Sequence, residues 1–160
     1  MRWLRRYWPV LAWAAAIWIF STEGFSSSNT SRLILPVLHW LFPQVSAETL
    51  ELIHFVIRKC AHLVEYFVFS LLVLHSIRGS RKGWQWRWGL IAIAVAAGYA
   101  AVDELHQAFE PTRGPSLSDV GLDTLGAALA QLCAAWWSLR HRSSSKTERV
   151  ELPGGTPPAG

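Results

Sequence analysis

Four apolar stretches separated by short polar connections constrain the fold of this chain more than any other feature. We expect membrane-spanning helices over these stretches, at about residues 7–25, 58–77, 88–105 and 117–139. A helix needs roughly 20 residues to cross the hydrocarbon core of a bilayer, and the first three stretches reach that length only with their polar flanks. The pattern predicts an all-α integral membrane bundle of four transmembrane helices, over residues 1–142, with charged residues drawn to the membrane boundary.

The composition favours lipid over water as the solvent of this chain. Hydrophobic residues make up 51% of its 160 residues and charged residues 16%, against roughly 25% charged residues in average soluble domains. Ten Trp residues are also far above ordinary usage. The first stretch follows a basic segment, as the core of a signal peptide would. No small-residue cleavage site follows it, so we favour an uncleaved helix.

The basic residues distinguish the two sides of the membrane. Most of them fall in the N-terminal segment, in the connection between the second and third stretches, and in the tail: Arg2, Arg5, Arg6, Arg78, Arg81, Lys82, Arg87, Arg140, Arg142, Lys146 and Arg149. Cytoplasmic segments carry such an excess of Lys and Arg. Four helices with both termini in the cytoplasm satisfy every cluster. Short clusters between apolar runs do not form a groove for phosphates, so we expect no nucleic-acid partner.

The first connection and the tail differ from the spans. Residues Leu33–Phe42 are apolar but too few to cross a membrane, which favours an extra interfacial or re-entrant helix in the first outer loop. The polar tail, residues 143–160, is expected to be disordered in the cytoplasm. Cys60 and Cys133 lie near opposite membrane faces in this topology, too far apart for a disulfide, and are expected to be free and buried.

A polar stripe marks the second apolar stretch, which we expect to be helical without a break from Ala47. The stripe follows helical spacings of three and four, and its members are Glu51, His54, Arg58, His62 and Glu65. A charge inside a membrane segment costs at least roughly 2.5–3.5 kcal/mol unless it is paired or hydrated. Lys59 can extend to the surface, whereas the shorter Glu65 needs Arg58, Arg113 or a proton of its own. The alternative to a functional stripe is internal salt bridging that packs the helices.

A second polar group surrounds the connection between the third and fourth stretches. Asp103, Glu104 and Gln107 end the third stretch, and Ser116 or Ser118 is positioned to cap the fourth. Asp119 follows in the first helical turn, where the helix dipole favours an anion, and Asp123 lies one turn further along the same face. Asp119 is compatible with simple capping, but an intramembrane carboxylate such as Asp123 is a functional candidate by default. The small residues Gly98, Gly121 and Gly126 are expected to let these helices pack closely.

Two segments resemble the signatures of one family. The segment from Arg58 to Tyr66 resembles the R-K-x-x-H-x-x-E-Y motif of VanZ-like membrane proteins. The segment from Asp103 to Gly126 resembles their second signature, D-E-x-x-Q-x-F-x-P-x-R, then S-x-x-D, then a polar residue before Gly. Its matches are Asp103, Glu104, Gln107, Phe109, Pro111, Arg113, Ser116, Asp119, Asp123, Thr124 and Gly126. The family often has Asn where this chain has Asp123, which leaves the role of that carboxylate open.

The resemblance implies a multi-pass protein of the bacterial cytoplasmic (inner) membrane whose role concerns the cell envelope. The family takes its name from an accessory protein of glycopeptide resistance associated with teicoplanin. The resemblance does not imply a particular chemical reaction. The sequence therefore predicts an outward-facing polar pocket of half the membrane depth that binds or modifies an envelope component, with a hydrophobic inner half below it. The candidate binding residues are Arg58, Lys59, His62, Glu65, Tyr66, Asp103, Glu104, Gln107, Arg113, Ser116, Asp119 and Asp123.

Two other classes of function remain open at this point. In a membrane enzyme acting on a lipid headgroup or a lipid-linked substrate, His62 or Glu65 would be the general base, tuned by Asp103 or Glu104. In a structural or partner-binding protein, the same charges would only fix the bundle. We predict no cofactor, although His62, Glu65 and Asp103 are weak candidates for a divalent metal. The expected partner is membrane lipid, with a lipid headgroup or a cell-wall precursor as the candidate ligand.

Overall fold

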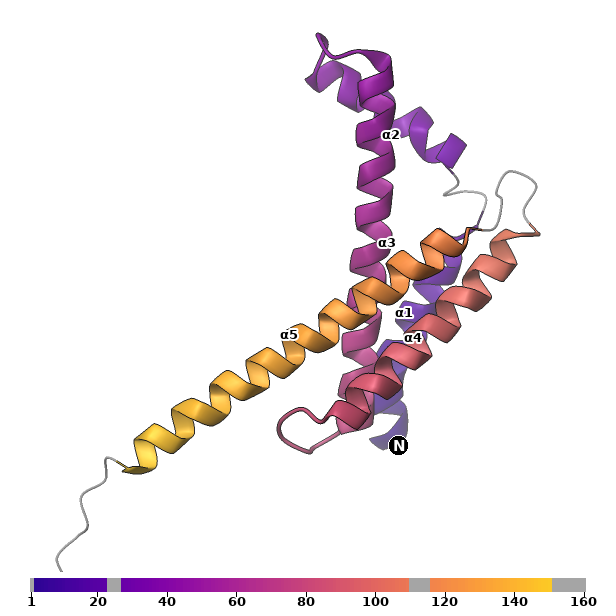
Figure 1. Ribbon diagram of the computed structural model, residues 1–160. Helices are drawn as coiled ribbons and strands as arrows, with labels where there is room; N and C mark the ends of the chain where they lie inside the picture. The colour runs from indigo at the N-terminus through magenta and orange to yellow at the C-terminus, as the bar shows by residue number, and fades with distance from the viewer. Residues whose placement is uncertain (1, 23–26, 110–115, 151–160) are drawn as a thin grey trace, which may run out of the picture.

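The computed structural model describes residues 2–22, 27–109 and 116–150, and it is helical throughout apart from short connections. The described residues form five α-helices and no strand, which confirms the all-α class (Figure 1). The helices are α1 (Arg2–Phe20), α2 (Ser27–Leu41), α3 (Ala47–Arg78), α4 (Trp86–Gln107) and α5 (Leu117–Val150). Within the described part, α3 packs against every other helix, and α5 also packs along α4.

Two helices, α3 and α4, are long and apolar enough to cross a membrane by length and composition, among the residues that the structure describes. In α1, basic residues precede the apolar run and several Trp residues interrupt it. In α5, Asp119, Asp123 and Gln131 lower the mean hydropathy of the N-terminal half. These two helices are therefore less apolar than α3 and α4. Large apolar side chains nevertheless lie exposed on all five helices, among them Leu11, Leu33, Leu52, Leu90 and Leu132. An exposed apolar surface of this extent is typical of contact with lipid or another protein.

The long helix α3 organises the bundle. Its N-cap is Ser46, whose Oγ accepts a hydrogen bond from the backbone N–H of Thr49, and its C-cap is Gly79, which has φ of 58°. At 1.5 Å per residue its 32 residues extend about 48 Å, more than the roughly 30 Å of a hydrocarbon core. The N-terminal part of α3 projects beyond α1, α4 and α5, and of the described helices α2 lies beside it (Figure 1).

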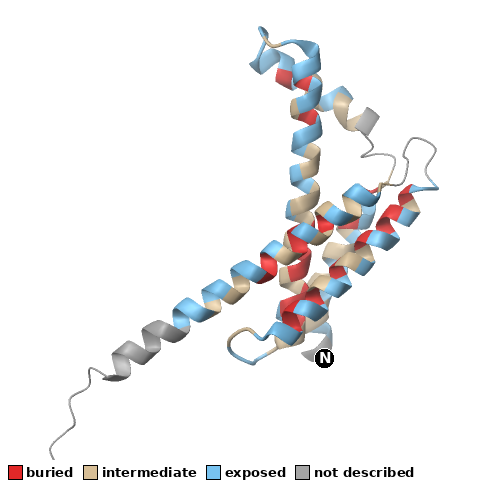
Figure 2. Cartoon of the chain, in the orientation of Figure 1, coloured by how far each residue is buried: buried red, intermediate tan, exposed pale blue. Residues whose placement is uncertain are grey.

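The buried core lies where α1, α3, α4 and α5 meet (Figure 2). Small side chains dominate α4 and α5 in this core, and larger ones come from α1 and α3: Ile17, Tyr66, Phe69, Val73, Ala92, Ala96, Ala100 and Ala127. Alanines at every fourth position of α4 let α3 and α5 approach closely. Gly126 has the same effect on α5, because a Cβ there would lie 2.4 Å from the carbonyl oxygen of Leu63.

The structure corrects several details that the sequence suggested. A Cβ on Gly98 or Gly121 would meet no atom within 4 Å, so these two glycines make no close approach within the described chain. The first helix ends at Phe20 and not near residue 25, because the Thr22 N–H bonds to Ile19 O in a tight turn. The cysteines are free but exposed.

The first connection contains a helix, as expected, but α2 begins at Ser27, six residues before the apolar run that starts at Leu33. Leu38 is its buried anchor, while Leu33, Val37 and Trp40 are exposed. Helix α5 continues to Val150. Residues 143–150, the first part of the tail that we expected to be disordered, are therefore helical. Residues 151–160 lie outside the described part, so disorder there stays a prediction.

Candidate functional site

Buried and half-buried polar side chains gather at the end of the bundle where α4 finishes and α5 starts, which we call the α4–α5 end. Asp103 and Glu104 come from the last turns of α4, Asp119 and Asp123 from the first turns of α5, and His62 from the middle of α3. The helical spacings of the sequence produce this convergence. Each residue lies on the face of its helix that packs against the neighbours.

Two charge pairs lie one above the other on the α3–α5 interface. Lys59 Nζ forms an ion pair with Asp119 Oδ1, and both side chains are partly exposed, at 29% and 18%. One turn deeper, His62 Nδ1 lies 3.5 Å from Asp123 Oδ1. That separation is within reach of an ion pair and long for a hydrogen bond. The pairs match because their members lie three positions apart on α3 and four positions apart on α5, about one turn in each helix.

The pair of His62 with Asp123 is less exposed to solvent than the pair of Lys59 with Asp119. The side chains of His62 and Asp123 are 15% and 4% exposed. A buried carboxylate is stabilised by a nearby positive charge or by a shared proton, since burial without a partner costs several kcal/mol. His62 is the cationic candidate that the described chain places beside Asp123. The pair can therefore hold one proton between the two helices.

A 240 Å³ cavity opens beside His62. Its walls come from the end of α1, from α2 and from α3: Phe20, Ser21, Thr30, Ile34, Ile57, Arg58, Ala61, His62 and Glu65. Arg58 Nη1 donates a hydrogen bond of 3.0 Å to Thr30 Oγ1, which ties α2 to α3 at the rim of the cavity. His62 thus belongs both to the cavity wall and to the pair with Asp123.

Asp103 anchors a separate network that joins α1 to α4. Ser21 Oγ and Gln107 Nε2 donate to Asp103 Oδ2 at 2.7 and 2.9 Å, and Gln107 Nε2 also contacts Ser21 Oγ at 3.2 Å. The Asp103 side chain is nearly inaccessible, as Asp103 is 2% exposed. The network holds the end of α1 against α4, which is a structural role.

The neighbouring Glu104 turns toward α5. Its Oε1 accepts a hydrogen bond from the backbone N–H of Ser116, directly before the first turn of α5. Ser116 Oγ contacts Ser118 Oγ at 2.7 Å. Glu104 therefore fixes the start of α5, the helix that carries Asp119 and Asp123.

The structure thus divides the candidate residues from the sequence into three groups. Lys59, His62, Asp119 and Asp123 form the α3–α5 row, while Arg58, His62 and Glu65 line the cavity. Asp103, Glu104, Gln107 and Ser116 fasten helices together. Tyr66 is completely buried in the core, where its ring meets Phe69 edge to face. Arg113 lies outside the described residues.

No group of three or more His, Cys, Asp or Glu residues that could hold a metal ion occurs in the part of the chain that the structure describes. His62, Glu65 and Asp103 are therefore not gathered into a ligand set there. Sequence reasoning missed Ser21 and Thr30. Ser21 follows an apolar run and Thr30 precedes one, which gave no distinct signal, because their partners lie 82 and 28 residues away.

A second polar network occupies the half of the bundle that we expected to be purely hydrophobic. Gln131 Nε2 donates to Ser70 Oγ at 2.8 Å, and Trp84 Nε1 donates to Gln131 Oε1 at 3.2 Å. Ser70 Oγ in turn donates to Ala127 O at 3.1 Å. The polar residues do not stop midway through the bundle, because Gln131 extends the Asp123 stripe toward the other end.

The fold and the site define an all-helical protein, within the described residues, with candidate membrane spans and a polar row between two of its helices. The VanZ/LLP1 family matches residues 7–138, and the chain belongs to this family. No curated protein and no solved structure matches it.

Proposed function

We propose that this VanZ-family protein crosses the bacterial cytoplasmic membrane four times, through α1, α3, α4 and α5, with both termini in the cytoplasm. The contacts between helices support this topology. Arg6 donates to the carbonyl oxygens of Ser76 and Ile77, and the Trp84 N–H donates to Ser138 Oγ at 3.1 Å. These bonds bring the three basic segments of the chain to one end of the bundle. A common cytoplasmic side follows from the excess of Lys and Arg.

In this topology the α4–α5 end faces outward, together with the cavity beside His62. The N-terminal part of α3 and the helix α2 then lie at or above the outer membrane surface. The length of α3 supports that placement, because its 48 Å or so exceeds the bilayer core by about 18 Å, or roughly twelve residues. Counted back from Arg78, the excess covers the turns before Lys59, which carries the first ion pair.

We propose that the cavity binds an amphiphilic component of the cell envelope, a lipid headgroup or a lipid-linked cell-wall precursor. Its walls combine Arg58, His62 and Glu65 with the apolar side chains of Phe20, Ile34 and Ile57. Arg58 can meet a phosphate or carboxylate, while the apolar wall can meet a chain or ring. Tolerance to glycopeptides such as teicoplanin is the cellular effect that the family's name suggests.

The observation that carries this proposal is the double position of His62, on the cavity wall and 3.5 Å from the nearly buried Asp123. A ligand in the cavity contacts a histidine whose charge depends on a carboxylate behind it. The same observation supports the alternative of a membrane enzyme. There, a histidine backed by a carboxylate acts as general base on a headgroup.

A complementation experiment tests the binding proposal. A strain lacking the protein receives wild type, His62→Ala or His39→Ala, and teicoplanin tolerance and lipid composition are measured at matched membrane levels of each variant. His39 is the control because it is an exposed histidine on α2. We expect His62→Ala to match the deletion strain and His39→Ala to match wild type. Wild-type tolerance and lipids in the His62→Ala strain would contradict the proposal.

A further inference from the structure

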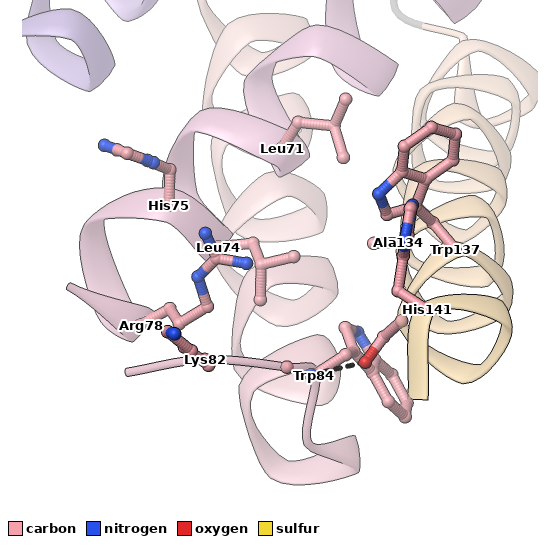
Figure 3. A pocket seen from close by; sticks show the side chains of 11 residues that line it. Leu71, Leu74, His75, Arg78, Lys82, Trp84, Ala134, Trp137 and His141 are labelled. Atoms are coloured by element: carbon pink, nitrogen blue, oxygen red, sulfur yellow. Dashed lines mark hydrogen bonds between the residues drawn. The ribbon is translucent and has the colours of Figure 1, made fainter. Parts of the chain in front are cut away.

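A second cavity, larger than the one beside His62, lies at the opposite end of the bundle, where α3 finishes and α4 starts. It has a volume of about 580 Å³ and is enclosed by the last turns of α3, the connection before α4 and one face of α5 (Figure 3). Leu71 and Leu74 of α3 face Trp137 of α5 across the opening. The volume falls within the roughly 300–1,000 Å³ of small-molecule sites.

The shape of this cavity is built by hydrogen bonds. The indole of Trp84 is held by Gln131 at 3.2 Å, and the backbone N–H of Trp84 is held by Ser138 Oγ at 3.1 Å. Both partners belong to α5. The connection after α3 is therefore fastened to α5 on one side of the opening, so that the cavity does not depend on an occupant to keep its walls apart.

The ionisable side chains that line this cavity are all basic. Arg78, Lys82, His75 and His141 are among its eleven lining residues, and no acidic residue is. Arg78 Nε is buried and makes no hydrogen bond within the described chain. A buried guanidinium donor without an acceptor costs free energy, and an anionic group in the cavity would supply the acceptor.

We propose that this cavity binds the headgroup of an anionic phospholipid from the cytoplasmic leaflet. The phosphate would meet Arg78 and Lys82, and the start of the acyl chains would lie against Leu71, Leu74 and Trp137. The proposal rests on the proposed topology, which turns this end toward the leaflet that carries anionic lipid. It is independent of the cavity beside His62, which lies at the other end of α3.

Native mass spectrometry of the full chain, released from nanodiscs of equal phosphatidylglycerol and phosphatidylcholine, tests this proposal. Wild type is expected to retain phosphatidylglycerol preferentially. Lys82→Gln, in an exposed connection, is expected to reduce that preference about 5-fold, since one basic group near the surface contributes about 1 kcal/mol. Arg140→Gln is the matched control, because Arg140 is basic, lies near the same end on α5 and does not line the cavity.

A second variant fills the cavity without changing its charge. Ala134→Phe adds a ring to the wall and is expected to lower lipid retention while far-UV circular dichroism stays that of wild type. Equal retention of the two lipids by wild type would overturn the proposal. So would an Arg140→Gln effect as large as that of Lys82→Gln, or complete displacement of the lipid by soluble glycerol phosphate, which would indicate a site for free phosphate. None of these results depends on teicoplanin tolerance.

Discussion

Asp123 of α5 lies 3.5 Å from His62 of α3, and the pair sits one helical turn below the ion pair of Lys59 with Asp119. The two pairs join the same two helices, but only the deeper one is shielded from solvent and borders a cavity. The deeper pair, His62 with Asp123, is therefore placed to contact a ligand in the cavity. The shallower pair, Lys59 with Asp119, is placed to hold α3 against α5, and we call it the clasp.

Replacing Asp123 separates binding from acid–base chemistry. In Asp123→Asn an amide oxygen stays beside His62 as a neutral acceptor, and the family signature that this segment resembles often has Asn at this position. We expect teicoplanin tolerance to stay near wild type in a complemented deletion strain. Loss of tolerance by tenfold or more with normal membrane levels would contradict the binding proposal and favour a catalytic His62–Asp123 pair.

The clasp is expected to have a modest coupling energy. A double-mutant cycle on Lys59→Met and Asp119→Asn, followed by thermal unfolding in detergent, should give about 1 kcal/mol, since both side chains are partly exposed. The single change at Lys59 also leaves Asp119 without its cation. A coupling energy of zero within error would show that the pair does not hold α3 against α5.

The close approach of α3 and α5 depends on Gly126. In Gly126→Ala the new Cβ would lie 2.4 Å from the backbone oxygen of Leu63, so the helices must separate, at a cost of about 1–3 kcal/mol. Gly121→Ala is the matched control on the same helix, because its Cβ would meet nothing within 4 Å. That change should be neutral, or stabilising by up to about 1 kcal/mol through helix propensity. Equal effects of the two substitutions on the unfolding temperature would rule out the close contact.

The docking of α1 depends on Ser21. Ser21→Ala removes a donor from Asp103 Oδ2 and is expected to destabilise the protein by about 1–3 kcal/mol, since a buried acceptor loses a partner. Ser80→Ala, at an exposed position after α3, should change stability by less than about 0.5 kcal/mol. Thermal unfolding in detergent compares the two. A Ser21→Ala protein as stable as Ser80→Ala would show that this bond does not hold α1.

The sequence predicted the parts of this fold that follow from local periodicity. The unbroken helix through His62, the polar end of α4 and the acidic first turn of α5 all follow from spacings of three and four. Because the faces of single helices were correct, Lys59 met Asp119 and His62 met Asp123. Whether His62, Glu65 and Asp103 approach one another did not follow from such spacings, since one face does not say how far apart residues on different helices will lie.

Other features depend on tertiary packing that no local pattern encodes. Gly98, Gly121 and Gly126 look alike in sequence, yet only Gly126 contacts a neighbouring backbone. Ser70 and Gln131 are 61 residues apart, and their hydrogen bond exists because α3 and α5 cross there. The large cavity beside Trp84 was missed because its walls come from segments that look like an ordinary basic loop and an ordinary apolar helix.

Cysteine accessibility tests the central claim, the outward orientation of the polar site, most directly. Glu48→Cys and Ser80→Cys are introduced separately into a Cys60→Ser, Cys133→Ser protein, and intact cells are treated with a membrane-impermeant maleimide. Both positions are exposed, at opposite ends of α3. We predict labelling of the cysteine at position 48 in intact cells, and of the one at position 80 only after the membrane is opened. Labelling at position 80 alone in intact cells would show that the polar site faces the cytoplasm, and it would contradict the account.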